Sequence, residues 1–404
     1  QKTAYEIPKR DWSSDVCSSD LLLPGPEAQQ LATYMGWMLH GTWGGVVAGA
    51  LFILPSVFVL LCLSMLYVVF GTMPAVAAVL MLLKPAVAAI VIGALIKISK
   101  KSLKQSKFII IAILSFVAIF FLEIKFPLII LAAIITGWVI EKYFRHVINK
   151  GNKEAVDDTD ESAYYINKHT AIKGSGFSKT RLAFQLISFC VLWSSPLLLF
   201  YFLSSDFPFW LQLTGFFSKA AFVTFGGAYA VLPYVAQYSV EKLHWLTHNQ
   251  MMDGLALGET TPGPLIMVLA FVGFIAGYNN FNDSLLGGSI GLLTTVFYTF
   301  LPSFYFILAG APLIEHTHQN VMLKNILNYV SSAVVGVLAN LCVILVMASV
   351  FILPHHFNAS NLNITNAIWL IASLVALQRF KINMLLWICI SAMSGLIMHL
   401  LKVV

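Results

Sequence analysis

Three charged residues lie within or beside long apolar stretches of this sequence, where they could bind an anion or carry a proton. Lys84 stands about ten residues into an apolar run, directly before Pro85, and Glu27 and Glu259 each neighbour a Pro-Gly-Pro triplet. A charged side chain at such a position is costly to bury and is usually functional. Lys84 is therefore the first candidate for direct contact with an anion.

Each of these charges also has a second interpretation. Lys84 could form a structural ion pair with Glu27 or Glu259, with room for its ammonium group where Pro85 disrupts the helix. The two glutamates are candidates for a coupling proton or a gate, and Glu259 could instead cap a helix dipole at the membrane interface. Asp253 lies on an amphipathic stretch and is expected to be solvated.

A broken helix is predicted between Phe222 and Pro264. Gly226 and Gly227 interrupt an apolar run, and a second interruption with the letters TTPGP follows at 260–264. In a bilayer, broken helix is tolerated only where it is buried in protein or lines a cavity. The freed N–H groups and helix N-termini carry partial positive charge and suit an anion. Simple kinking with close helix packing is the alternative, since glycine is common in membrane helices.

Neutral candidates for substrate binding come from these interruptions and from the first Pro-Gly-Pro triplet. They are Thr224, Gly226, Gly227, Tyr229, Thr260, Thr261, Gly263 and Gly25. The predicted helix breaks are Pro24, Pro26, Pro233, Pro262 and Pro264. A proline close to the start of a helix fits its first turn, because the missing N–H has no partner there anyway.

The composition indicates what kind of protein must position these residues. Of 404 residues, 59% are hydrophobic and 10% are charged, whereas a soluble domain has roughly a quarter charged residues. The bilayer must therefore be the solvent for most of the surface. Segments that are apolar on all sides predict helices rather than the alternating strands of a β-barrel. We predict an all-α polytopic membrane protein.

Several function classes lack support in the sequence. The net charge of +6 comes from lysines at helix ends, which the positive-inside rule explains, so no nucleic-acid partner is predicted. The histidines and cysteines show no metal-ligand spacing, and no nucleophile–base constellation is recognisable, so we predict neither an enzyme nor a cofactor. No Walker motif is present, which argues against ATP hydrolysis.

Polar segments divide the predicted membrane helices. A charged linker extends over 144–181, and an amphipathic stretch at 236–262 contains a predicted capping box of Thr247 and Gln250. The apolar segments fall near 31–50, 51–71, 74–98, 107–123, 126–143, 182–203, 207–235, 263–280, 285–310, 325–353, 363–378 and 383–403.

Lysines and arginines orient these segments. They crowd the loop near 98–107 and the linker, and two helices separate the two regions, so both can face the cytoplasm. Counting onward predicts that 236–262 faces the cytoplasm and that Asn279–Asp283 faces outside. The same count places the first Pro-Gly-Pro triplet on the outer side and the second on the inner side.

The two parts of the chain resemble each other in the same order of motifs. The matching pairs are PGPEAQQLATYMGW at 24–37 with PGPLIMVLAFVGF at 262–274, FILPSVF at 52–58 with TFLPSF at 299–304, IVIGAL at 90–95 with VVGVL at 334–338, and Gly137 with Gly395. With the predicted orientation, this is an inverted-topology repeat with broken helices. Such repeats are typical of alternating-access transporters.

The repeat also gives domain boundaries. Residues 1–20 contain SSDVCSSD, which resembles translated adaptor sequence, and we predict a non-native segment there, with a native disordered N-terminus as the alternative. The N-terminal repeat at 21–143 is predicted to be incomplete, because about fifty residues precede the second triplet and lack a counterpart. The C-terminal repeat covers 182–404.

Three long blocks resemble the chromate transporter family. They are FVTFGGAYAVLPYV, WLTHNQMMDGLALGETTPGPLIMVLAFVGF and LPGPEAQQLATYMGWMLHGTWGGVVAGALFILPS, and the similarity extends from Leu21 onward, although the family's usual N-terminal FGG block is absent. The resemblance implies a bacterial inner-membrane protein with two homologous halves that expels chromate and confers resistance to it.

The sequence leaves open which oxyanion is carried and whether the protein is a transporter or a channel. Exit of a dianion is downhill when the cell interior is negative, by roughly 4.6 kcal/mol at about 100 mV. Sulfate has nearly the same charge and shape as chromate, so a sulfate or other oxyanion transporter is the second hypothesis. A channel would not need the inverted pair of broken helices. The lipid bilayer is the expected surrounding partner, and a homodimer is left open.

Overall fold

The computed structural model describes residues 25–143, 179–204, 206–224, 228–261, 263–317, 321–351 and 362–401, and these residues are almost entirely helical. The helices are α2 (Glu27–Phe70), α3 (Pro74–Ser102), α4 (Ser106–Phe120), α5 (Phe126–Tyr143), α7 (Lys179–Leu203), α8 (Phe207–Val223), α9 (Ala228–Gln237), η2 (Tyr238–Lys242), α10 (His248–Thr260), η3 (Leu265–Met267), α11 (Val268–Asn280), α12 (Leu285–Thr317), α13 (Val321–Val350), α14 (Ile364–Gln378) and α15 (Met384–Leu400). The prediction of an all-α membrane protein is confirmed.

Six of the described helices are long and apolar enough to cross a membrane. Four further apolar helices, α4, α11, α14 and α15, have 13 to 17 residues, fewer than the roughly 20 that a full crossing needs. Large apolar side chains such as Phe58 and Phe184 are exposed on the outer helices. Such a surface suits lipid rather than water.

Helix α2 folds back on itself at His40 and Gly41. Gly41 has φ +69°, which favours glycine, and it separates a short arm, residues 27–39, from a long arm, residues 42–70. Thr33 of the short arm contacts Gly49 of the long arm, because glycine leaves room there. The predicted division into segments 31–50 and 51–71 is therefore wrong. The sequence is apolar through the turn, so hydrophobicity alone did not reveal it.

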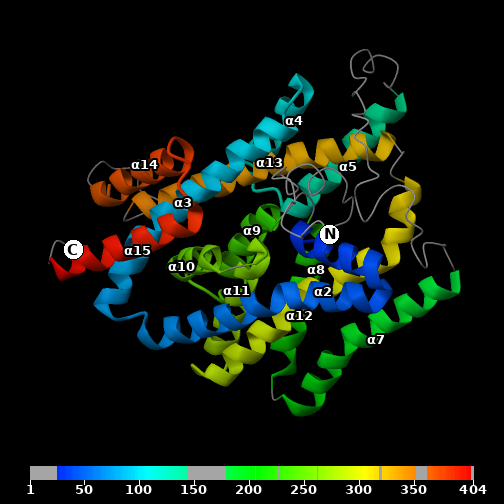
Figure 1. Ribbon diagram of the computed structural model, residues 1–404, viewed down its shortest axis with the longest axis horizontal. Helices are drawn as coiled ribbons and strands as arrows, with labels where there is room; N and C mark the ends of the chain where they lie inside the picture. The colour runs from blue at the N-terminus through cyan, green and yellow to red at the C-terminus, as the bar shows by residue number, and fades with distance from the viewer. Residues whose placement is uncertain are drawn as a thin grey trace, which may run out of the picture.

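The two halves of the chain pack in a reciprocal way. α3 packs against α14 and α15, whereas α13 packs against α4 and α5 (Figure 1). Gly395 of α15 lies against Ala78 of α3, and Gly137 of α5 lies against Tyr329 of α13. The two glycines that the sequence comparison paired thus serve equivalent contacts with opposite halves.

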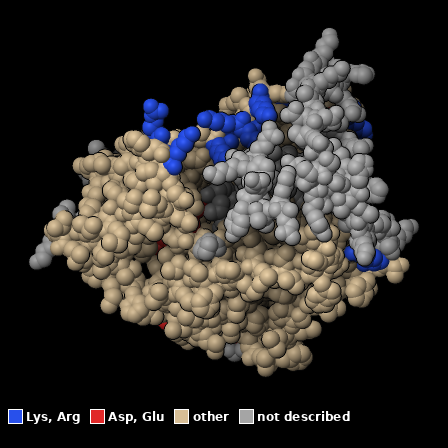
Figure 2. Space-filling view, viewed as in Figure 1, with Lys and Arg blue, Asp and Glu red and all other residues tan. Residues whose placement is uncertain are grey.

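One end of the helix bundle is basic. The last turn of α3 contains Lys100 and Lys101, and α4 begins near Lys107, whose ammonium lies over the ring of Tyr329 in the third turn of α13. Arg181 at the start of α7 donates to Thr42 just after the α2 turn. Lysine and arginine side chains gather mainly along one edge of the face in Figure 2. We call this the basic end.

The opposite end holds the loops around residues 206, 245 and 280. The Asn279 side chain donates to the Trp245 carbonyl at 2.9 Å, and Asn280 donates to Asp206 at 2.9 Å. Loop 243–247 therefore lies at the same end as Asn279. The prediction that 236–262 and Asn279–Asp283 face opposite sides is wrong, because α8–α9 and α10–α11 each turn back part-way instead of crossing as one helix.

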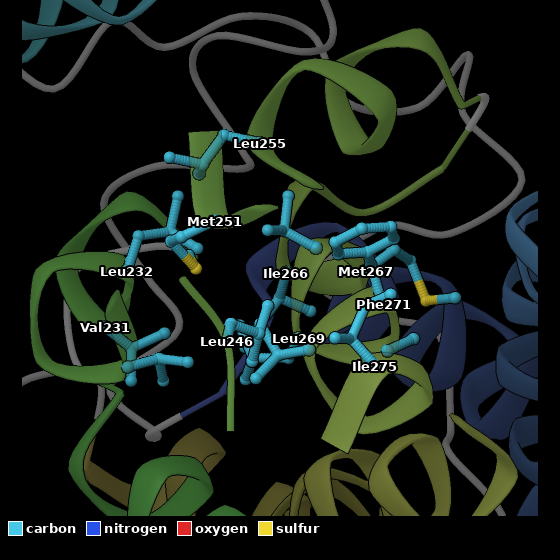
Figure 3. Close-up of a cluster of buried hydrophobic side chains, with 14 of the residues drawn as sticks. Val231, Leu232, Leu246, Met251, Leu255, Ile266, Met267, Leu269, Phe271 and Ile275 are labelled. Atoms are coloured by element: carbon cyan, nitrogen blue, oxygen red, sulfur yellow. The ribbon is translucent and has the colours of Figure 1, made fainter. Parts of the chain in front are cut away.

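A buried apolar cluster holds these turned-back helices together. Side chains from α9, from loop 243–247, from α10 and from η3–α11 converge in it (Figure 3). Gly254 and Gly258 bring α10 close to Phe271 and Val268. Helix α10 opens with the predicted capping box, in which Thr247 and Gln250 bond each other's backbone N–H groups. This packing fixes the position of the chain break after α10.

Candidate functional site

The first Pro-Gly-Pro triplet docks on the second half of the chain. Gly25 has φ +136°, and its N–H donates to the Thr224 carbonyl at 2.7 Å, at the break that follows α8. A Cβ on Gly25 would lie 2.8 Å from the Ser303 hydroxyl of α12. Only glycine combines this backbone conformation with such a close approach.

The second triplet makes the corresponding contact with the first half. Gly263 has φ +141°, and a Cβ there would collide with the Ser56 hydroxyl. Ser56 follows Pro55 in the long arm of α2, just as Ser303 follows Pro302 in α12. We call the Gly25–Ser303 and Gly263–Ser56 contacts together the crossed contacts.

The crossed contacts lie part-way along their helices. Ser56 is near the centre of the long arm of α2 and Ser303 is near the centre of α12. Both triplets are therefore placed at mid-depth of the bundle. The prediction that one lies at the outer surface and the other at the inner surface is wrong, because the short arm of α2 and α11 each begin in the interior.

Three predicted threonines close the helix ends beside these contacts. Thr224 donates to the Ala220 carbonyl at 2.6 Å, Thr260 to Leu257 at 2.6 Å, and Thr261 to Gly258 at 2.8 Å. Their hydroxyl protons thus satisfy the last carbonyls of α8 and α10. Each hydroxyl would have to release that bond before it could donate to a ligand.

Some predicted site residues cannot be placed. Pro24, Gly226, Gly227 and Pro262 lie outside the described residues, as does the side chain of Tyr229. α8 ends at Val223, Thr224 is non-helical, and α9 begins at Ala228.

The prolines that are described behave in different ways. Pro26 is extended and directly precedes α2, and the Pro264 carbonyl accepts from Met267 as η3 begins. Both therefore fit the predicted helix starts. Pro233 lies inside α9, which continues to Gln237, so the predicted break at Pro233 is wrong. Fully buried neighbours such as Val231 hold α9 together despite the missing N–H.

Lys84 is half-buried and forms an ion pair with a buried residue that was not predicted as its partner. Its ammonium lies 3.0 Å from Asp253 Oδ1, and Tyr67 Oη donates to Asp253 Oδ2 at 3.0 Å. Asp253 is only 6% exposed, so the expectation that it is solvated is wrong. The expected partners Glu27 and Glu259 are not in this pair. α3 also continues through Pro85 without a break.

The two glutamates keep the positions that the sequence indicated. Glu27 is the first residue of α2, partly buried beside the first triplet. Glu259 is 2% exposed in the last turn of α10, close to the second triplet. Each carboxylate therefore lies within a few residues of one crossed contact.

Comparison with known proteins decides the family. The family model described as "Chromate transporter" matches residues 14–138 and 211–396, about three quarters of the chain. The chain belongs to the chromate transporter family. It is accordingly a multi-pass membrane protein of a transporter family rather than of an enzyme family.

Relatives of this chromate transporter family member occur in bacteria and archaea. The chromate transport protein of Pseudomonas aeruginosa is 30% identical over 78% of this chain and 67% of its own length. That of Cupriavidus metallidurans is 26% identical over 82% and 72%. An uncharacterized transporter of Methanocaldococcus jannaschii is 26% identical over 78% and 70%. No solved structure matches.

A buried polar chain that the sequence did not predict joins the two halves of this chromate transporter family member. Ser303 donates to Gln29 Oε1 at 2.6 Å, and Gln29 Nε2 donates to Thr33 at 2.8 Å. All three side chains are fully or almost fully buried. The sequence carries this signal as two glutamines, Gln29 and Gln30, that follow Glu27 and Ala28 after the first triplet. It also carries it as the serine in each of the two matched LPS motifs.

Proposed function

We propose that this protein exports chromate, a tetrahedral dianion, across the bacterial inner membrane by alternating access. The crossed contacts carry the proposal. Each Pro-Gly-Pro triplet starts a helix at mid-depth and packs on the LPS serine of the other half, as expected if two related halves enclose one central site.

The directions of the helices support an inverted repeat. The short arm of α2 runs from Gly25 to the turn near Thr42 at the basic end, whereas η3 and α11 run from Gly263 to Asn280 at the opposite end. The basic end faces the cytoplasm under the positive-inside rule. Equivalent helices of the two halves then point to opposite sides of the membrane.

The charges around mid-depth suit an oxyanion. The N-termini of α2 and η3 carry partial positive charge that favours an anion. Lys84 supplies a full positive charge from α3. In this proposal the three threonines complete the binding site, and Glu27 and Glu259 couple or gate the movement.

The export direction follows from the substrate charge. Moving two negative charges out of a cell with a potential of about 100 mV releases roughly 4.6 kcal/mol. Import of the same dianion would need a coupling ion. Relatives that carry the name chromate transport protein support chromate as the substrate.

Uptake into inverted membrane vesicles tests the proposal. Vesicles from cells that produce this chain are supplied with labelled chromate, with and without excess sulfate, beside Lys84→Ala and the exposed-residue control Lys104→Ala. We expect protein-dependent accumulation that falls with Lys84→Ala and is unchanged with Lys104→Ala. Accumulation of sulfate alone would exclude chromate as the substrate, and the absence of both would contradict the proposal.

A further inference from the structure

The ion pair between Lys84 and Asp253 connects two helices with different roles. Lys84 belongs to α3, which packs against α13, α14 and α15. Asp253 belongs to α10, which ends seven residues later at Thr260 and leads into the crossed contact of Gly263 with Ser56. A change at Asp253 therefore acts on the same rigid helix that positions one of the two triplets, about 10 Å away along its axis.

Asp253 already neutralises the positive charge of Lys84 that a bound anion would need. Its Oδ1 lies 3.0 Å from the Lys84 ammonium, and the two side chains are 9% and 20% exposed. A substrate that binds Lys84 must therefore compete with a carboxylate that is already in place.

We propose that Asp253 is the resident counter-ion of Lys84 and that an entering dianion displaces it, which releases α10 from α3. This inference rests on the proposed function, since it assumes that Lys84 binds the transported oxyanion. Tyr67 donates a hydrogen bond to Oδ2, the oxygen that does not face Lys84. In this proposal the displaced carboxylate keeps that bond. Tyr67 is thus a positioning residue that leaves the displaced Asp253 carboxylate with one hydrogen-bond donor.

The competition gives selectivity for charge. At equal distance, a dianion attracts the ammonium about twice as strongly as a carboxylate does, whereas a monoanion gains no such advantage. A tetrahedral monoanion such as perchlorate would fit the same space but would not displace Asp253. The pair therefore selects dianions over monoanions of the same shape.

Inhibition of chromate uptake by perchlorate and by sulfate tests the inference. With the unchanged protein, we expect sulfate to inhibit at a concentration at least about tenfold lower than perchlorate, a difference that corresponds to about 1.4 kcal/mol. Asp253→Asn keeps the size of the side chain and removes the competitor. We expect it to lower the half-saturating chromate concentration and to make perchlorate nearly as effective as sulfate.

Two further variants separate this role from a structural one. Asp283 is an exposed aspartate in the loop before α12, and Asp283→Asn is the matched control. It should change neither the half-saturating chromate concentration nor the relative inhibition by sulfate and perchlorate. The exchange Lys84→Asp with Asp253→Lys keeps an ion pair but moves the positive charge to α10. If the pair only holds the fold, the exchanged protein will transport chromate normally, and the inference is overturned.

The outcomes also distinguish this inference from the proposed function. An unchanged protein that carries neither chromate nor sulfate contradicts the proposed function itself. Transport of chromate together with equal inhibition by sulfate and perchlorate in the unchanged protein overturns the inference alone, and this measurement needs no variant to fold. The inference alone is also overturned if a well-folded Asp253→Asn variant shows the same inhibition by sulfate and perchlorate as the unchanged protein.

Discussion

Gly263 of the second half lies with its Cα directly against the hydroxyl of Ser56 in the first half, with no space for a side chain between them. Gly25 and Ser303 form the reverse pair, in which the first half supplies the glycine and the second supplies the serine. Both glycines have φ close to +140°. In both contacts a glycine with the same backbone conformation meets a serine of the other half. Substitution of either glycine therefore tests whether these contacts matter.

Replacing Gly263 with alanine should disable the protein. The added methyl group collides with Ser56, and φ +141° costs a residue with a side chain about 1–3 kcal/mol. We expect a lower thermal unfolding temperature in detergent and little chromate uptake. Adding Ser56→Gly should recover part of the loss, because it removes the collision but not the backbone strain.

Gly215→Ala provides the control for this substitution. Gly215 lies within α8, and a Cβ there has no neighbour within 4 Å. Alanine favours a helix interior by roughly 0.5–1 kcal/mol over glycine. The control should therefore be as stable as the unchanged protein or slightly more so. Equal losses for both alanine variants would mean that the contact with Ser56 is unimportant.

Removing the Tyr67 hydroxyl should lower the stability of the folded protein, because Asp253 Oδ2 then loses its hydrogen-bond donor. Hydrogen bonds to charged groups contribute about 1.5–3 kcal/mol, compared with about 0.5–1.5 kcal/mol for neutral ones. Tyr67→Phe should therefore lower the unfolding temperature more than Tyr298→Phe, which removes a neutral bond to the Trp193 carbonyl. In a background of Asp253→Asn the difference should shrink, and an undiminished effect of Tyr67→Phe would contradict the hydrogen bond.

Much of the helix pattern could be predicted from the sequence, because long apolar runs between polar loops are a local signal. The segment predicted at 126–143 coincides with α5, and the capping box of Thr247 and Gln250 is present. Glycine and proline motifs also marked Pro26 and Pro264 as helix starts, although they did not predict the serines that the triplets contact. These features depend on neighbours in the chain and not on tertiary packing.

The contacts between distant helices could not be predicted in the same way. The choice of Asp253 rather than Glu259 as the partner of Lys84 depends on how α10 turns against α3, which its amphipathic pattern does not specify. The turn at Gly41 was hidden because apolar residues lie on both sides of it. A count of membrane crossings also fails where helices turn back part-way. For this reason 236–262 was wrongly predicted to face the side opposite Asn279–Asp283.

Crosslinking can test the turn at Gly41. Thr33 and Gly49 are in contact across the two arms of α2, whereas a continuous helix would separate them by about 24 Å. In a variant from which all five cysteines of the sequence are removed, Thr33→Cys with Gly49→Cys should form a disulfide under mild oxidation. Thr33→Cys with Leu61→Cys, farther along the long arm, is the control that should not. Failure of the first pair alone would favour the straight helix.

Labelling from outside the cell can test the end to which loop 243–247 belongs. His244 lies next to Trp245, whose carbonyl accepts from Asn279, so His244 and Asn280 should share one side of the membrane and Lys104 the other. With single cysteines at these positions, a membrane-impermeant maleimide should label His244→Cys and Asn280→Cys in cells with a permeable outer membrane. Lys104→Cys should react only after the inner membrane is opened. If His244→Cys instead reacts together with Lys104→Cys, α8–α9 and α10–α11 would cross the membrane rather than turn back, and the mid-depth position of Gly263 would be lost with them.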